Sequence, residues 1–156
     1  MLGRLFSLFR TPQPAGPPKL LKSFTPAEQT IARQGVTAAQ GQWAIEAAET
    51  VTVCLYEVPN PGVEQCVVNY RAELRTEDVK GRAFLEMWCR LPGRGEFFSK
   101  GFTNAVKGTC EWASYEIPFY LKAGQKPDLI RLNLVIEGGG KVWLRRLELL
   151  TTPLLP

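Results

Sequence analysis

Residues 82–103 constrain the fold more than any other segment, because they form two apolar-rich runs joined by Pro92-Gly93-Arg94-Gly95. Proline and glycine supply the backbone angles that tight turns need. In the first run, apolar residues alternate with a mixed set, which is the pattern of a strand with one buried face. The residues of the apolar set are Ala83, Leu85, Met87, Cys89 and Leu91. The segment therefore predicts a β-hairpin.

Further strands are predicted along most of the chain, in short runs separated by turn residues. These runs cover residues 42–47, 51–57, 66–74, 113–121, 129–137 and 141–150. One of them contains Pro118, and since proline cannot donate a ladder hydrogen bond, that run is expected at a sheet edge or a bulge. Eight or nine strands without a long helix predict an all-β chain, folded as an antiparallel sandwich or barrel.

The first forty residues differ from the rest. Residues 1–10 contain Leu2, Leu5, Phe6, Leu8 and Phe9 beside two arginines. This composition predicts either a short amphipathic helix that contacts a membrane surface or a partner, or a frayed tail. Residues 11–18 hold four prolines, so residues 1–18 are expected to be a tail and a stiff linker.

The lead-in to the sandwich is expected at residues 19–40, as a short helical or irregular segment. A capping threonine, Thr25, is followed by Pro26 at the first helical position, which predicts one or two helical turns ending near Arg33. The β-sandwich itself is then expected over residues 41–152.

Composition excludes several classes of function. The chain contains no histidine, the commonest general base and a frequent metal ligand. Its four cysteines lack the CxxC spacing of zinc sites, so no metal and no cofactor are expected. Lysine and arginine are scattered despite a net charge of +4, so no nucleic-acid partner is expected.

The expected location is the cytoplasm. The sequence has no apolar run of 18 residues, and Arg4 interrupts the apolar patch that a secretory signal would need. Cysteines that behave as small buried hydrophobes agree with a reducing compartment.

Three motifs occur in the C-terminal half of the chain. They are Gly108-Thr109-x-x-Trp112-x-x-Tyr115-x-x-x-Phe119-x-Leu121, Pro127-x-x-Ile130-x-Leu132-x-Leu134 and Glu137-Gly138-x-Gly140-x-Val142-Trp143. Together they resemble the galactose-binding-like jelly roll, a superfamily that includes several families of carbohydrate-binding modules. The resemblance covers about residues 43–150 and implies a jelly-roll β-sandwich with a binding role.

One position departs from that pattern. After the Val-Trp pair, the modules usually continue with a hydrophobic residue and an acidic pair, which often supports a structural calcium ion. Here Leu144 is followed by Arg145 and Arg146, and arginines cannot ligate calcium. No metal is therefore carried over from the resemblance, and the departure leaves sugar binding open.

The mixed face of the hairpin is the best candidate site. A four-residue turn would place Trp88 opposite Ser99 and leave the indole between a carboxylate and a guanidinium. An aromatic plate beside such groups suits a sugar, because the plate stacks on C–H faces while the polar groups hold hydroxyls. The predicted ligand-binding residues are Trp88, Glu86 and Arg90, joined by Asn69, Arg71, Arg131 and Asn133 if their strands lie in the same sheet.

Two functions follow from this face. The first is a non-catalytic module that recognises a carbohydrate or a similar polar ligand. The alternative is an intracellular protein-interaction or scaffold module of the same fold that has lost sugar binding, since Trp, Arg and Glu pairs also stabilise an ordinary sheet face. An enzyme is not expected, because no spacing selects the two carboxylates, about 5 Å apart, that a retaining glycosidase needs. The other tryptophans are Trp43, Trp112 and Trp143, all expected as packed or rim residues.

Overall fold

The computed structural model describes residues 11–156, and the predicted amphipathic helix of residues 1–10 lies outside the described residues. The described chain is almost entirely β-structure. Its strands are β1 (Lys19–Phe24), β2 (Val36–Ala39), β3 (Gln42–Ala47), β4 (Val51–Pro59), β5 (Cys66–Leu91), β6 (Gly95–Lys100), β7 (Val106–Leu121), β8 (Leu129–Ile136) and β9 (Gly140–Pro153). A single 3-10 turn, η1 (Phe102–Asn104), joins β6 to β7.

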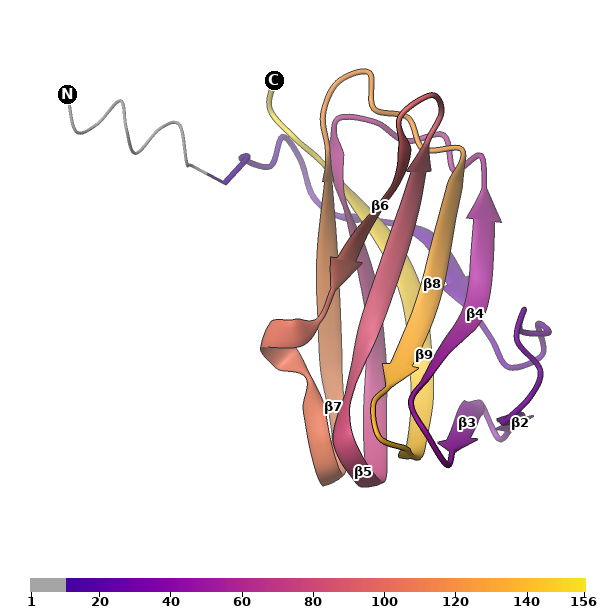
Figure 1. Ribbon diagram of the computed structural model, residues 1–156. Coiled ribbons are helices and arrows are strands. Elements are labelled where there is room, and N and C mark those ends of the chain that lie inside the picture. Colours follow the sequence, from indigo (N-terminus) through magenta and orange to yellow (C-terminus); the bar gives the residue numbers. More distant parts are fainter. Residues whose placement is uncertain (1–10) are drawn as a thin grey trace, which may run out of the picture.

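Strand β5 organises the two layers of the fold. Residues 66–77 of β5 pair with β7 on one side and β9 on the other, whereas residues 83–91 pair with β8 and β6. Between these parts, Asp78 has a positive φ of 51°, a conformation in which an aspartate can turn the chain. Figure 1 shows β5 turning back on itself at the bottom of the view, so that its two halves lie in different layers.

The first layer consists of β7, the first half of β5, and β9, with β1 and β3 along the far edge of β9 and β2 beside β3. The second layer is β6, the second half of β5, β8 and β4. All pairings between these strands are antiparallel. The predicted all-β antiparallel sandwich is therefore confirmed.

The core lies between the layers and is built from the alternating residues. The apolar set that the hairpin pattern selected is buried, with Leu85, Met87 and Cys89 almost inaccessible to solvent. Facing them from the first layer are Tyr70, Leu74, Leu144 and Leu149. Pro118 lies on β7, which pairs only with β5 among the described strands, so the predicted edge strand is confirmed.

The hairpin pairs one residue out of the predicted register. Leu91 lies opposite Gly95, and Trp88 lies opposite Phe98 instead of Ser99. The turn is one residue shorter than predicted because Gly93, at φ 75°, allows the Arg94 N–H to bond the Leu91 carbonyl, and Gly95 already joins the ladder. The predicted register would have placed Lys100 on the inner face, where its charge would be buried. The observed register places Lys100 opposite Glu86 on the outer face.

One prediction for the N-terminal part needs correction. The helical turns after Thr25 are wrong: the residues form a turn, closed by a bond from the Glu28 N–H to the Thr25 carbonyl, and strands β1 and β2 flank it. The proline-rich residues 11–18 lie against the C-terminal end of the chain through the Pro14–Leu154 bridge. Among the described residues, no helix is long and apolar enough to cross a membrane.

Candidate ligand-binding face

The outer face of the second layer, here called the hairpin face, brings together five of the seven predicted site residues. Glu86, Trp88 and Arg90 come from β5, and Arg131 and Asn133 come from β8. Register places Glu86 opposite Asn133 and Trp88 opposite Arg131. The hairpin face therefore forms because antiparallel pairing aligns alternate residues of two neighbouring strands on one side.

Glu86 is the centre of this face. The residue is buried, with only 5% of its surface exposed. Oε1 accepts hydrogen bonds from Trp88 Nε1 at 2.9 Å and from Asn133 Nδ2 at 2.8 Å. Oε2 lies 3.5 Å from Lys100 Nζ. A buried carboxylate is tolerated only when it is paired and hydrogen-bonded, and here three donors satisfy it.

The bond to Glu86 fixes the orientation of the Trp88 ring. With its N–H engaged, the indole packs against Phe98 of β6 at a centroid separation of 5.1 Å and a tilt of 54°. Phe98 is 53% exposed, and Lys100 Nζ lies 4.6 Å from the centroid of its ring. The result is a pair of aromatic rings held in place at the surface beside polar groups.

The remaining charges on the hairpin face are paired with one another. Arg131 bonds Glu57 on β4 at 3.1 Å and approaches Glu96 on β6 at 3.5 Å. Arg90 donates to Asp128 at 2.8 Å, and this bond raises the pKa of the Arg90 guanidinium above its usual value. Both arginines are thereby held in position by acidic residues.

Two further groups on this face bear on its chemistry. Cys54 of β4 lies opposite Asn133, and burial raises the pKa of its thiol to about 11, so the thiol stays protonated at neutral pH. Asn133 Oδ1 is buried and has no hydrogen-bond partner among the described residues. An unpaired buried acceptor is unfavourable by about 1–3 kcal/mol, so this oxygen has unused capacity to accept a hydrogen bond.

The other two predicted residues lie elsewhere. Asn69 and Arg71 belong to the first half of β5, opposite Pro118 and Glu116 of β7, and so face outward from the first layer. Arg71 donates to Glu148 of β9 at 2.9 Å. The bend at Asp78 separates them from Trp88, so the structure does not bring them into the same face.

The outer face of the first layer, here called the tryptophan face, carries a cluster that the sequence pattern did not reveal. The Arg75 guanidinium carbon lies 3.9 Å from the centroid of the Trp143 ring, and Lys141 Nζ lies 4.7 Å from it. The Arg145 guanidinium lies 4.1 Å from the Trp112 ring. Trp112 and Trp143 are half-buried, whereas Trp43 is fully buried in the core. The stacked cations explain how two tryptophans are placed on an outer face.

A β-bulge explains the Arg145-Arg146 departure. Between the pairs Arg71–Glu148 and Glu73–Arg145, strand β9 contains one more residue than β5, and Arg146 has a positive φ of 53°. Both arginines consequently reach the same carboxylate: Arg145 at 2.8 Å and Arg146 at 3.3 Å from Glu73. The pair of arginines was visible in the sequence, but its carboxylate partner, 72 positions earlier, was not.

Several solved structures resemble this sandwich. The CBM22-1 xylan-binding domain of Xyn10C from Paenibacillus barcinonensis is 12% identical, with a TM-score of 0.52 over 94% of this chain and 100% of that one. A CBM4 structure is 9% identical, with a TM-score of 0.48 over 80% and 79% of the two chains. TmCBM61, solved in complex with beta-1,4-galactotriose, is 15% identical, with a TM-score of 0.47 over 90% and 92%.

The likeness to the xylan-binding domain shows the fold. This chain has the same β-sandwich fold as that domain, so the sandwich predicted from the motifs of the C-terminal half is confirmed. No protein-family model matches the sequence, and no curated protein matches it either.

Proposed function

We propose that this protein is a non-catalytic binding module that takes a carbohydrate, or a ligand of similar hydroxyl-rich chemistry, on the hairpin face. The observation that carries the proposal is the bond from Trp88 Nε1 to the buried Glu86 carboxylate, which holds an indole ring at the surface next to the exposed ring of Phe98. A prearranged aromatic surface binds a ligand without a large loss of side-chain entropy.

The groups around the two rings match the chemistry of a sugar. Aromatic rings stack on the apolar C–H faces of a pyranose, while hydroxyls need donors and acceptors at the rim. Lys100 and Arg131 lie there, and each carries N–H groups beyond those that Glu86, Glu57 and Glu96 accept. The fold likeness to a xylan-binding domain agrees with a saccharide as ligand, although the ligand named there belongs to that protein.

The test is binding of the full chain to a glycan array, followed by affinity electrophoresis in gels that contain the polysaccharides that bind. Phe98→Ala is the informative variant because its ring is exposed and its loss leaves the core intact. Phe97→Ala is the matched control: Phe97 is the neighbouring residue, 43% exposed, but it lies opposite Cys89 and faces the other way. We expect binding to fall at least about tenfold in Phe98→Ala and Trp88→Ala and to stay unchanged in Phe97→Ala.

Absence of binding to any glycan, or equal binding by the Phe97 and Phe98 variants, would refute the hairpin face as a sugar site. The second candidate function would then be favoured: an intracellular protein-interaction or scaffold module of the same fold that has lost sugar binding. The observation that favours it is the mutual pairing of Arg131 with Glu57 and Glu96 and of Arg90 with Asp128, which occupies polar groups that a ligand would use. Recovery of a defined protein partner by the full chain, and its loss in Trp88→Ala, would establish that function.

A further inference from the structure

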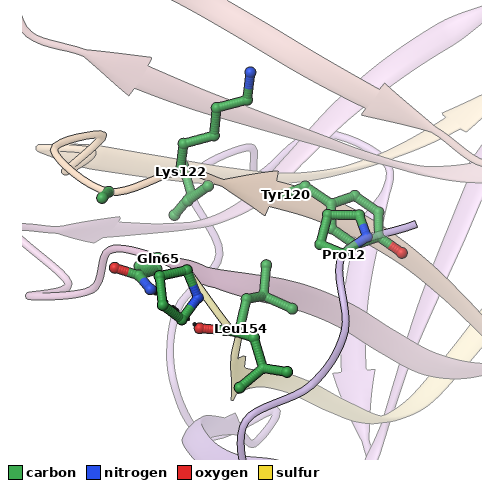
Figure 2. Close-up of a pocket in the computed structure, with 9 residues that line it drawn as sticks. Pro12, Gln65, Tyr120, Lys122 and Leu154 are labelled. Carbon is green, nitrogen blue, oxygen red and sulfur yellow. Dashed lines mark hydrogen bonds between the residues drawn. The ribbon is translucent and has the colours of Figure 1, made fainter. Parts of the chain in front are cut away.

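A pocket lies at the end of the sandwich where the two ends of the described chain meet. Its volume is about 320 Å³. Figure 2 shows the residues around it: Pro12 from the N-terminal segment, Tyr120 at the end of β7, Lys122 just after that strand, and Leu154 from the C-terminal residues. We call it the terminal pocket.

The lining of the terminal pocket is apolar and partly open to water. Leu121 and Leu154 form buried parts of it, whereas Tyr120 and Leu155 are among the most exposed large hydrophobic residues of the described chain. Exposed apolar side chains gathered around one hollow mark a surface that another apolar group covers.

Backbone hydrogen bonds hold the N-terminal segment at the rim of this pocket. The Leu155 N–H donates to the Gln13 carbonyl at 2.8 Å, and the Ala15 N–H donates to the Pro153 carbonyl at 2.7 Å. On the other side, Gln65 bonds the Leu154 carbonyl through Nε2 at 3.2 Å. Pro12 is thus fixed in the wall of the pocket, and residues 1–10 end two positions before Pro12 in the sequence.

The residues next to Pro12 in sequence have the composition that such a pocket accepts. Residues 1–10 contain Leu2, Leu5, Phe6, Leu8 and Phe9. An extended residue spans at most about 3.6 Å, so Phe9 can reach up to roughly 11 Å from Pro12, and Phe6 up to roughly 22 Å. A short tether of this kind gives an effective concentration in the millimolar range.

We propose that the terminal pocket is the docking site for the apolar residues of positions 1–10 of the same chain. The occupant is favoured over a separate partner because the segment is covalently attached at the pocket wall and carries five large apolar side chains. Docking covers Tyr120 and Leu155 and adds the N-terminal residues to the sandwich.

The experiment places a photo-crosslinker, p-benzoylphenylalanine, at position 6 of the full chain and maps the products by mass spectrometry. We expect crosslinks within one chain to Tyr120, Leu154 or Leu155, with a yield independent of protein concentration. Leu155→Glu should reduce this yield about tenfold or more, because a carboxylate would have to be buried under the docked residues. Leu20→Glu is the matched control, since Leu20 is 55% exposed and Leu155 56%, and Leu20 is not part of the pocket.

A second measurement separates docking from loss of folding. Leu155→Glu and Leu20→Glu should have the same near-ultraviolet circular dichroism as the unsubstituted chain, since both positions are exposed. Crosslinks between two chains, crosslinks only to lipid when anionic vesicles are present, or equal yields in the two variants would overturn the proposal. The first outcome would show that residues 1–10 bind a second copy of the chain, and the second would show that they bind a membrane.

Discussion

The two outer faces of this sandwich hold their tryptophan rings by different contacts. On the hairpin face, a buried carboxylate bonds the edge of Trp88 through Nε1, and the ring packs against Phe98. On the tryptophan face, cations stack on the rings: Arg75 and Lys141 on Trp143, and Arg145 on Trp112. Among residues 11–156, no lysine or arginine stacks on the ring of Trp88.

This difference is the reason we propose Trp88, and not Trp112 or Trp143, as the tryptophan that contacts a ligand. A ring whose face is covered by a cation offers less of that face to a ligand. On the hairpin face this applies to Phe98, because Lys100 Nζ lies 4.6 Å from its ring centroid, but not to Trp88. A ring held by its edge keeps part of its face available. The number of tryptophans and arginines in a sequence therefore says less about binding than the partner of each ring does.

The largest expected effect comes from removing the centre of the hairpin face. Glu86→Ala leaves Trp88 Nε1 and Asn133 Nδ2 without their acceptor and leaves Lys100 without its charge partner. Because Glu86 is buried, we expect the free energy of unfolding to fall by about 2–4 kcal/mol. Urea denaturation monitored by tryptophan fluorescence measures the change.

The matched control for that prediction is Glu148→Ala on the tryptophan face. Glu148 also accepts from a cross-strand arginine, Arg71, but the pair is partly exposed to solvent. Its removal should reduce stability by less than about 1 kcal/mol. Equal effects of the two substitutions would show that Glu86 is not the structural centre of its face.

The second effect tests the stack on the tryptophan face. Arg75→Ala removes the guanidinium that lies over Trp143, together with the apolar stem that supports it. We expect a loss of about 1–2 kcal/mol in the free energy of unfolding, and Arg75→Lys should restore part of it. The measurement is the same denaturation experiment, with glycan binding as a second readout.

Binding separates the two faces in that experiment. If the hairpin face holds the ligand, Arg75→Ala leaves the affinity unchanged while stability falls. If Arg75→Ala lost as much affinity as Phe98→Ala, the binding site would be assigned to the tryptophan face instead of the hairpin face.

The sequence predicted the layers better than it predicted the faces. Alternation with a period of two assigns each residue to an inner or outer side, so the buried set from Ala83 to Leu91 was correct. It does not say which strands are neighbours. Asn69 and Arg71 were grouped with Trp88 on the condition that their strands share a sheet. The break between residues 74 and 82 does not tell whether the second strand stays in the same layer or crosses to the other one.

Register was the second limit. The turn Pro92-Gly93-Arg94-Gly95 allows loops of different length, and glycine fits both a turn and a strand end. A shift of one residue exchanged the partners of Trp88 and moved Lys100 from the inner face to the outer one. The Arg75–Trp143 stack depended on the register of β5 with β9, across 68 positions of sequence, and no local pattern reports such a pairing.

The smallest expected effect on stability comes from Arg90→Ala. Arg90 bonds Asp128, but the pair lies at the surface, where the bond competes with water and salt. We therefore expect no measurable change in the midpoint of urea denaturation. Binding is the more informative measurement, because Arg90 follows Trp88 by two residues on the same side of β5 and is among the residues predicted to hold a ligand.

A lower affinity of Arg90→Ala for a glycan at unchanged stability would place Arg90 in the ligand contact and extend the site from Phe98 toward the loop that carries Asp128. An unchanged affinity would restrict the site to the rings of Trp88 and Phe98 and the groups beside them. Asp128→Asn serves as the control, since it removes the partner of Arg90 but leaves the guanidinium in place. If that variant binds more tightly, the bond to Asp128 competes with the ligand for the same guanidinium.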